Sequence, residues 1–234
     1  MSPISYNLQA VRERIAEGAR AALRDPRNVH LLAVSKTFGA DAVIEASDAG
    51  QRAFGENYLQ ESVDKMAAVR AARPDLSLEW HFIGPIQSNK TRPIAEHFDW
   101  VHSVDREKIA HRLSEQRPAH LPPLNICLQV NISGEDTKSG AAPEEVAALA
   151  KAVAALPNLK LRGLMAIPEP AEDTARQREP FRKLRELLEQ LNKEGLGLDT
   201  LSMGMSADMD AAIAEGATIV RVGTAIFGQR TYAR

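Results

Sequence analysis

Lys36 stands at the end of an apolar run, at a position where a turn residue is more usual: residues 31–38 read LLAVSKTF. If this run is a β-strand, its side chains alternate between two faces, and Lys36 points to the same side as Leu32 and Val34. Burial there favours the neutral amine, which is nucleophilic and forms a Schiff base with an aldehyde. On position alone, the alternative is a solvated surface lysine.

Two glycine-containing segments near the end of the chain could bind a phosphate group. In SMGMSAD, Gly204 permits close backbone approach, and we predict that Ser206 is the N-cap of a helix over 207–215. In RVGTAIFG, Gly223 and Thr224 offer backbone N–H groups and a hydroxyl group. For either segment alone, glycines that only form turns are the simpler interpretation. The presence of both segments favours a phosphate site.

Arg221 interrupts the β-branched segment TIVRVG and would share a strand face with Ile219 and Gly223. A buried arginine needs an acceptor, which could be a carboxylate across the core or the ring nitrogen of a bound cofactor. Because guanidinium stays protonated, a pyridine nitrogen facing it stays unprotonated and withdraws electrons weakly. An aldehyde-reactive lysine beside phosphate-binding loops predicts pyridoxal 5′-phosphate (PLP), held as an aldimine of Lys36.

Other candidates have weaker signals. Asn57 follows an apolar run in FGENYLQE, where it could bond the cofactor or cap the next helix. His81 is interpreted as a hydrogen-bonded strand histidine, and no ligand set at metal spacing accompanies it, so we predict no metal site. Lys90 and Lys138 are interpreted as solvated, with a secondary anion site as the alternative. The only cysteine, Cys127, lies in LNICLQV and is interpreted as a buried, unreactive thiol.

The composition of the 234 residues favours a small-molecule ligand. With 29 Lys+Arg against 31 Asp+Glu the net charge is −2, and no basic stripe indicates nucleic acid or a membrane surface as a partner. No apolar stretch approaches membrane-spanning length, and the charged N-terminal segment is unlike a signal peptide. We therefore expect a cytoplasmic protein, and a monomer.

Eight short apolar runs must position these residues. They span 30–35, 53–56, 79–84, 98–104, 124–131, 161–167, 199–204 and 218–223. Segments of helical period separate them, which predicts parallel strands connected by helices. Eight such units predict an α/β fold, a single-domain (β/α)₈ TIM-type barrel over residues 1–234. An open doubly wound sheet is the alternative.

The helices are predicted from apolar periodicity and first-turn residues. The stretch 143–156 begins with a proline and two glutamates, and FRKLRELLEQLN repeats leucine on one face. An extra N-terminal helix has an apolar face formed by Leu8, Val11, Ile15 and Leu23. The segment 168–180 is interpreted as a long, mobile loop after the sixth strand. In such a barrel, sites form at the strand C-termini and phosphate is commonly held after strands seven and eight.

The chain also resembles a known family. The segments that carry the resemblance are AVSKTF, FGENYLQE, WHFIGPIQSNK, VNISGEDTKSG, GLMAIP and SMGMSADMDAAIAEGATIVRVGTAIFG, in order between residues 31 and 228. They are similar to the pyridoxal phosphate homeostasis protein family, whose barrel is related to the alanine racemase N-terminal domain. This resemblance implies PLP on Lys36, phosphate contacts from Ser206, Gly223 and Thr224, and Arg221 at the ring nitrogen. It also implies a role in distributing PLP and in amino-acid balance, with apo PLP-dependent enzymes as partners and no catalytic activity.

An amino-acid racemase is the alternative function. Racemisation needs a base on each face of the substrate Cα, and only Lys36 is evident, although Tyr58 could be proposed for the second face. Related racemases add a further domain that carries this base, whereas the present sequence ends eleven residues after Gly223. A Schiff-base aldolase that uses Lys36 without a cofactor is a third possibility, and it would purify colourless. We therefore predict a PLP carrier.

Overall fold

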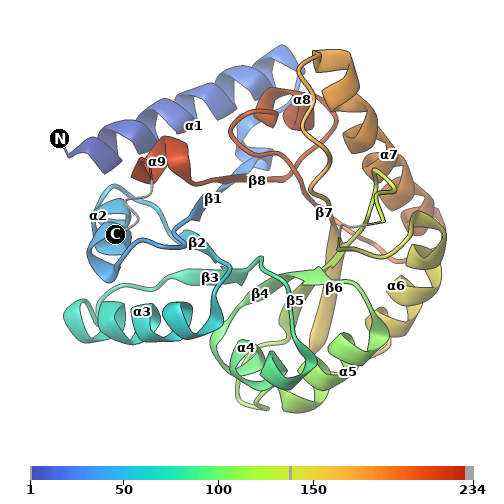
Figure 1. The fold of residues 1–234 in the computed structure, drawn as a ribbon, viewed down its shortest axis with the longest axis horizontal. Coiled ribbons are helices and arrows are strands. Elements are labelled where there is room, and N and C mark those ends of the chain that lie inside the picture. Colours follow the sequence, from blue (N-terminus) through green and yellow to red (C-terminus); the bar gives the residue numbers. More distant parts are fainter. Residues whose placement is uncertain (1, 137–138, 230–234) are drawn as a thin grey trace.

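Eight parallel strands surround a central axis in the computed structural model of the protein, which describes residues 2–136 and 139–229 (Figure 1). The strands are β1 (His30–Val34), β2 (Ala53–Glu56), β3 (Glu79–Phe82), β4 (Trp100–Val104), β5 (Leu124–Gln129), β6 (Leu159–Met165), β7 (Thr200–Ser202) and β8 (Ile219–Val222). Each strand falls on one of the eight predicted apolar runs, with β6 starting two residues earlier than expected. The strands follow one another in chain order around the ring.

Pairing of the first strand with the last closes the barrel. Leu32 of β1 is opposite Arg221 of β8, and Ala33 is opposite Val222, in a parallel register. The predicted (β/α)₈ barrel is therefore confirmed, and the open doubly wound sheet is wrong. Closure leaves no free sheet edge and brings the C-terminal ends of all eight strands to one mouth.

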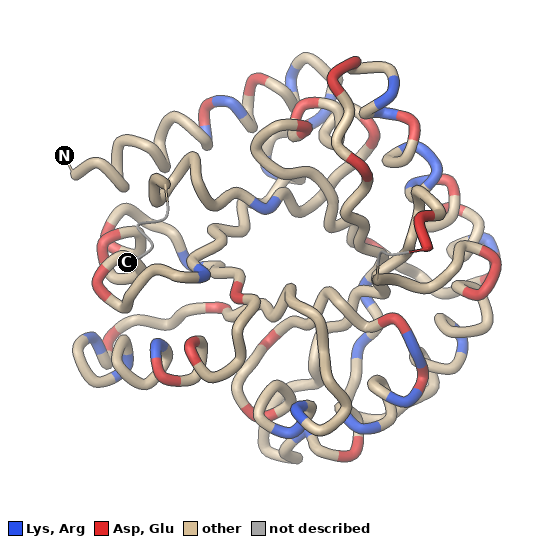
Figure 2. Tube along the Cα trace, in the orientation of Figure 1, with Lys and Arg blue, Asp and Glu red and all other residues tan. Residues whose placement is uncertain are grey.

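Helices cover the outside of the ring. They are α1 (Pro3–Ala21), η1 (Pro26–Asn28), α2 (Ala40–Asp48), α3 (Leu59–Ala72), η2 (Ser88–Lys90), α4 (Thr91–His97), α5 (Glu107–Gln116), η3 (Pro143–Glu145), α6 (Val146–Ala154), α7 (Thr174–Lys193), α8 (Met209–Ala214) and α9 (Thr224–Phe227). Figure 2 shows most charged positions on these outer helices and few on the inner ring of strands. The predicted extra N-terminal helix is α1, which packs along α8 and α9.

The helices form because their apolar residues recur on one face, which the barrel covers. In α7 this face consists of Phe181, Leu184, Leu188 and Leu191, all buried. Burying each of these side chains contributes roughly 1.5–3 kcal/mol. The Asp173 carboxylate caps the helix by accepting a hydrogen bond from the Arg176 N–H.

Two apolar clusters make up the core. The larger lies between the helices and the outside of the barrel. The smaller fills the barrel interior and consists of Leu32, Trp100, Cys127, Met165 and Ile219. Cys127 is completely buried, which confirms the prediction of a buried thiol. This burial raises the pKa of the thiol to about 12.

Three local predictions are wrong in detail. The segment 168–180 is not a continuous loop, because α7 begins at Thr174 and Pro180 lies inside this helix. Leu23 is not on the buried face of α1: the helix ends at Ala21, and Leu23 is 96% exposed with φ 57°. The predicted helix 143–156 begins as the 3₁₀ turn η3 and becomes α-helical only from Val146.

Candidate functional site

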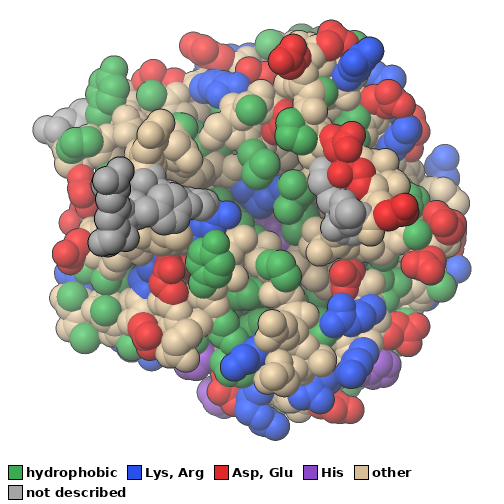
Figure 3. All heavy atoms as spheres, in the orientation of Figure 1, with side chains coloured by type: hydrophobic (Ala, Val, Ile, Leu, Met, Phe, Trp, Pro, Cys, Tyr) green, Lys and Arg blue, Asp and Glu red, His purple; other side chains and the backbone are tan. Residues whose placement is uncertain are grey.

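A pocket of about 340 Å³ opens at the C-terminal mouth of the barrel. Its lining residues are Val34, Lys36, Phe38, Asn57, Ile83, Ile167, Met205, Ser206, Ala207, Arg221, Gly223 and Thr224. All six residues that the sequence analysis selected for a cofactor site are among them. Figure 3 shows a hollow at the centre of this face, with Lys and Arg atoms inside it and hydrophobic side chains around it. This volume lies in the range of small-molecule sites.

Lys36 reaches this mouth from the turn that follows β1, and its side chain is half-buried. Thr37 after it has a φ of 68°, which is a strained conformation for a β-branched residue. The Thr37 N–H donates to the Glu61 carboxylate at 2.6 Å, so α3 holds the strained turn in place. Strain of this kind is tolerated where the surrounding structure fixes a residue for function.

A buried ion pair lies beneath this turn. Lys65 Nζ bonds Glu56 Oε1 at 2.5 Å, the Ser35 carbonyl oxygen at 2.8 Å and Glu61 Oε1 at 3.0 Å. The Ser35 hydroxyl donates to the same Glu56 oxygen at 2.6 Å. Burial raises the pKa of Glu56, and the charge of Lys65 opposes this rise. The sequence analysis did not identify this ion pair, because its members come from the turn after β1, from β2 and from α3.

Asn57 lies just beyond β2 and has an unsatisfied side-chain oxygen. Its Oδ1 atom is buried and has no hydrogen-bond partner in the described part of the chain. Tyr58, not Asn57, occupies the N-cap position of α3, so Asn57 does not serve as the helix cap. A buried acceptor without a donor costs about 1–3 kcal/mol, which is typical of a group that a ligand satisfies.

Ser206 lines the pocket but is not the predicted N-cap. A turn separates it from α8, and Asp208 is at the cap position, where its carboxylate accepts from the Met205 N–H at 2.7 Å. The Ser206 carbonyl accepts from Arg14 of α1 at 2.9 Å, which fixes the loop from outside. Gly204 has a φ of 97°, and an added Cβ would lie 2.5 Å from Ala212 Cβ of α8, so glycine is required there by the packing of the loop on this helix.

Gly223 and Thr224 form the start of α9, the short helix after β8. The Ile226 N–H bonds the Gly223 carbonyl at 2.9 Å, so the first-turn N–H groups that could donate to a ligand are those of Thr224 and Ala225. Phe227 of this helix stacks on Phe38 from the loop after β1, with ring centroids 5.2 Å apart. The loops that carry Lys36 and Thr224 are thereby held together.

Arg221 lies within the pocket, and its side chain is almost completely buried. Its Nη1 donates to Ser202 Oγ at 2.7 Å and its Nη2 to the Ala166 carbonyl at 3.1 Å. No ion pair among the described residues involves Arg221, so the alternative of a carboxylate across the core is wrong. Burial lowers its pKa to about 10, and the guanidinium therefore remains protonated at neutral pH.

Sequence reasoning did not find four large apolar residues of the lining, Phe38, Ile83, Ile167 and Met205. Their only signal is that each of these residues follows a strand closely. Ser202, which holds Arg221, has no distinguishing signal at all. Lys90 ends η2 and is exposed, outside the pocket lining. Lys138 lies outside the described residues.

A larger cavity, of about 710 Å³, lies at the opposite mouth of the barrel. Charged groups there already pair with one another: Arg162 forms an ion pair with Asp199, and its guanidinium lies 4.6 Å from the centroid of the Trp100 ring. The cavity lacks an amine of the Lys36 kind, so its chemistry does not suit an aldehyde. In residues 2–136 and 139–229, no group of His, Cys, Asp or Glu side chains could hold a metal ion. The same residues include no helix that is both long enough and apolar enough to cross a membrane.

The fold and site define a (β/α)₈ barrel whose mouth presents a lysine, a buried arginine and two glycine-containing loops. The family profile described as "Alanine racemase, N-terminal domain" matches residues 6–231, and the chain belongs to this family. A protein of Pseudomonas aeruginosa named "Pyridoxal phosphate homeostasis protein" is 67% identical over 232 residues, which is 99% of this chain and 98% of that protein. A protein of Escherichia coli K12 with the same name is 54% identical over the full length of both chains.

A solved structure shows the same fold. PipY of Synechococcus elongatus, whose structure was determined with PLP bound, is 38% identical, with a TM-score of 0.82 over 96% of this chain and 100% of that one. The expected membership in a family of PLP homeostasis proteins is thus confirmed at the level of sequence and fold.

Proposed function

We propose that this chain binds PLP in the pocket at the C-terminal mouth and exchanges it with other proteins, including apo PLP-dependent enzymes. The observation that carries the proposal is the convergence of Lys36, Arg221 and the unsatisfied Asn57 Oδ1 in one pocket with Ser206 and Thr224. The names of the relatives from P. aeruginosa and E. coli, and the PLP bound to PipY, support the same ligand.

Each residue group matches one part of the ligand. The amine of Lys36 would bond the aldehyde carbon covalently. The hydroxyl groups of Ser206 and Thr224 and the first-turn N–H groups of α9 would donate to the phosphate. Arg221 would donate to the ring nitrogen, which keeps that nitrogen unprotonated because guanidinium does not give up its proton. When bound, PLP supplies an aldehyde that forms reversible links with amines.

The lining of the pocket supports a carrier over an amino-acid racemase. Among the described residues of the lining, Lys36 is the only side chain that can act as a base, so the opposite face of a substrate has no proton acceptor. Tyr58, the one candidate from the sequence, is half-exposed and is not part of the lining. Arg221 also limits electron withdrawal by the ring. Reversible binding needs neither a second base nor strong electron withdrawal.

The first test locates the covalent link. The purified protein should absorb in the visible range, and borohydride followed by peptide mapping should place the label on Lys36. Lys36→Ala should lose the label but retain weaker, phosphate-dependent binding, whereas the matched variant Lys90→Ala should behave like the wild type. A colourless wild-type protein that does not bind added PLP would refute the proposal, and a label mainly on Lys90 would refute the role of Lys36.

The second test separates carrier from enzyme. Holoprotein is incubated with each common amino acid in both enantiomers, and racemisation, decarboxylation and transamination are assayed. An apo-enzyme that needs PLP is then offered as acceptor, with free PLP at the same concentration as a control. We expect transfer without turnover. Turnover on the order of 1 s⁻¹ or faster would support the racemase alternative. PLP that never reaches the acceptor would refute the carrier proposal.

A further inference from the structure

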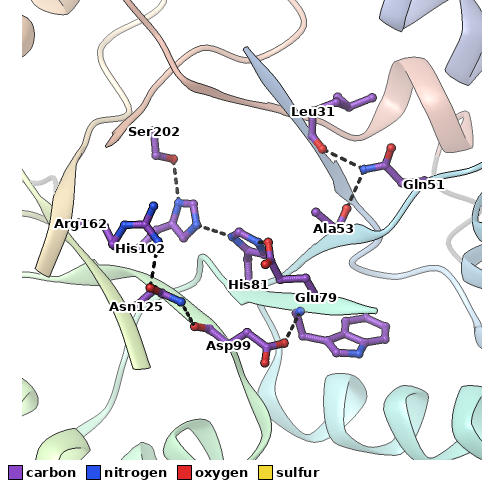
Figure 4. A network of polar contacts seen from close by, with 11 residues as sticks. Leu31, Gln51, Ala53, Glu79, His81, Asp99, His102, Asn125, Arg162 and Ser202 are labelled. Carbon is purple, nitrogen blue, oxygen red and sulfur yellow. Dashed lines mark hydrogen bonds and ion pairs between the residues drawn. The ribbon is translucent and has the colours of Figure 1, made fainter. Parts of the chain in front are cut away.

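A chain of buried polar side chains crosses the barrel interior from the opposite mouth to Arg221. Glu79 Oε1 lies 2.7 Å from His81 Nε2, and His81 Nδ1 lies 2.8 Å from His102 Nε2 (Figure 4). His102 Nδ1 lies 2.7 Å from Ser202 Oγ, which accepts from Arg221 Nη1 at 2.7 Å. His81, His102 and Ser202 are all buried, whereas the Glu79 side chain is 51% exposed.

The Glu79 end of this chain determines the direction of every hydrogen bond in it. An ionised carboxylate only accepts, so His81 carries its hydrogen on Nε2 and donates to Glu79, and the neutral His81 ring accepts at Nδ1. His102 therefore carries its hydrogen on Nε2 and donates to His81 Nδ1, and its own Nδ1 accepts from the Ser202 hydroxyl. The Ser202 oxygen in turn accepts from Arg221, which can only donate. Each group therefore donates once toward Glu79.

The electrostatics of the two histidines agree with this arrangement. Burial lowers the pKa of His81 and lowers that of His102 well below its ordinary value, with the nearby charge of Arg221 contributing at His102. The hydrogen bond from His81 lowers the pKa of Glu79, so its carboxylate is ionised. Two neutral imidazoles thus connect a cation at one mouth to an anion at the other.

We propose that Glu79, His81, His102 and Ser202 are positioning residues for Arg221, and that they determine its orientation from the opposite mouth of the barrel. The proposal rests on the proposed function, in which Arg221 faces the cofactor ring. It explains how a buried guanidinium is stabilised without a carboxylate in the pocket. A carboxylate bonded directly to Arg221 would place negative charge beside a site that must accept a phosphate. In the observed arrangement the negative charge is on Glu79, which is separated from Arg221 by four hydrogen bonds.

The first test measures the tautomers directly. With ¹⁵N-labelled histidine, the six histidines of the full chain give ring-nitrogen signals, which His81→Asn and His102→Asn variants assign. At pH 7.5 we expect His81 and His102 to be neutral, with hydrogen on Nε2 and a bare Nδ1. Hydrogen on Nδ1 of either ring, or a doubly protonated ring, would overturn the proposal, whether or not the protein binds PLP.

The second test measures the coupling across the barrel with a matched pair of variants. Glu79→Ala removes the terminal acceptor, so His81 can adopt either tautomer. Because His81 Nδ1 bonds His102 Nε2, the tautomer of His102 then varies with that of His81. Asp199→Ala removes a carboxylate from the same mouth that pairs with Arg162 and is outside the chain. We expect mixed tautomers and PLP binding weakened about three- to tenfold for Glu79→Ala. For Asp199→Ala we expect a single tautomer and binding within about twofold of the wild type.

Equal PLP affinities and unchanged tautomers in the two variants would overturn the coupling. If Glu79→Ala does not fold, Ser202→Ala replaces it, with Ser114→Ala as its control, because Ser114 is another buried serine whose hydroxyl bonds a single backbone carbonyl. Ser202→Ala should weaken PLP binding about tenfold, and Ser114→Ala should leave it unchanged. A wild type with the expected tautomers that does not bind PLP would refute the proposed function and leave the direction of the chain standing.

Discussion

Replacing Lys65 with methionine tests the buried ion pair beneath the turn that carries Lys36. Methionine keeps most of the volume but leaves the Glu56 carboxylate, whose side chain is fully buried, without its cation. Glu56 also has one carboxylate oxygen with no hydrogen-bond partner among the described residues, so little else compensates the charge. An unpaired buried charge of this kind typically costs 3–5 kcal/mol.

Protonation limits this cost in a way that can be calculated. Neutralising a carboxyl group whose ordinary pKa is 4.5 costs about 1.36 kcal/mol for each pH unit above that value, or about 3.4 kcal/mol at pH 7. Burial already raises the pKa of Glu56 in the wild type, so part of this penalty is present before the substitution. The lost hydrogen bond from Lys65 to the Ser35 carbonyl adds about 1 kcal/mol. We therefore expect Lys65→Met to lower the free energy of unfolding by about 2–4 kcal/mol at pH 7.

The pH dependence is the signature of this cause. At pH 5 the cost of protonating Glu56 falls to about 0.7 kcal/mol. The effect of Lys65→Met on the free energy of unfolding should therefore be smaller at pH 5 than at pH 7 by at least about 1 kcal/mol. Urea unfolding followed by circular dichroism at pH 5 and pH 7 measures this difference. In the double variant Lys65→Met/Glu56→Gln, most of the dependence on pH should disappear, because the fully buried carboxyl group is gone and only the partly exposed Glu61 carboxyl group remains.

A surface pair provides the control. Lys151 bonds Glu194 at 2.6 Å but is 61% exposed, so Lys151→Met should cost less than about 1 kcal/mol at either pH. If Lys65→Met destabilised the protein equally at pH 5 and pH 7, the loss would come from packing, and the reasoning from an unpaired charge would be refuted.

Three further predictions concern stability, the site and the thiol. Burial lowers the pKa values of His81 and His102, so below about pH 6.5 the unfolded chain binds more protons than the folded protein. The free energy of unfolding should therefore fall as the pH decreases from 6.5, by up to about 1.4 kcal/mol per pH unit for each histidine. A His102→Asn variant should show a smaller slope. Gly84→Ala would place a Cβ 2.4 Å from the Asn57 carbonyl oxygen, so it should displace Asn57. PLP binding, measured by equilibrium titration, should weaken about tenfold or more. An unchanged affinity would argue against a role for Asn57. The Cys127 thiol, with its pKa raised to about 12, should react with a thiol reagent at pH 8 only as fast as the protein unfolds, whereas rapid labelling of the native protein would contradict its burial.

The sequence by itself determined the barrel and six of the twelve residues that line the candidate pocket. Alternating apolar runs and helical periods are local signals, and they marked all eight strands within a few residues. The candidate residues Lys36, Asn57 and Gly223 could be selected because each lies within two residues of a strand end, and a closed parallel barrel gathers all strand C-termini at one mouth. Their association in the pocket is therefore a consequence of chain order.

Local boundaries were less determined, because they depend on packing as well as on sequence. Ser206 has the residue type of a helix cap, yet Asp208 takes that position and Arg14 of the N-terminal helix holds the Ser206 carbonyl. Thr174 begins a helix in a segment that reads as a loop, because its apolar face starts only at Phe181. At Ser206 an element distant in sequence selects among conformations that the local residues allow, whereas the start of α7 is set locally, by the Asp173 cap.

Only the tertiary structure decided what Arg221 bonds inside the barrel. The sequence indicated that a buried arginine needs an acceptor, but it could not distinguish a carboxylate from a hydroxyl group. Ser202 and His102 are 100 positions apart, and they meet because β7 and β4 both turn these side chains into the barrel interior. A one-residue shift in register would turn either side chain to the outside of the barrel. No local signal encodes that register, since it results from the closure of all eight strands.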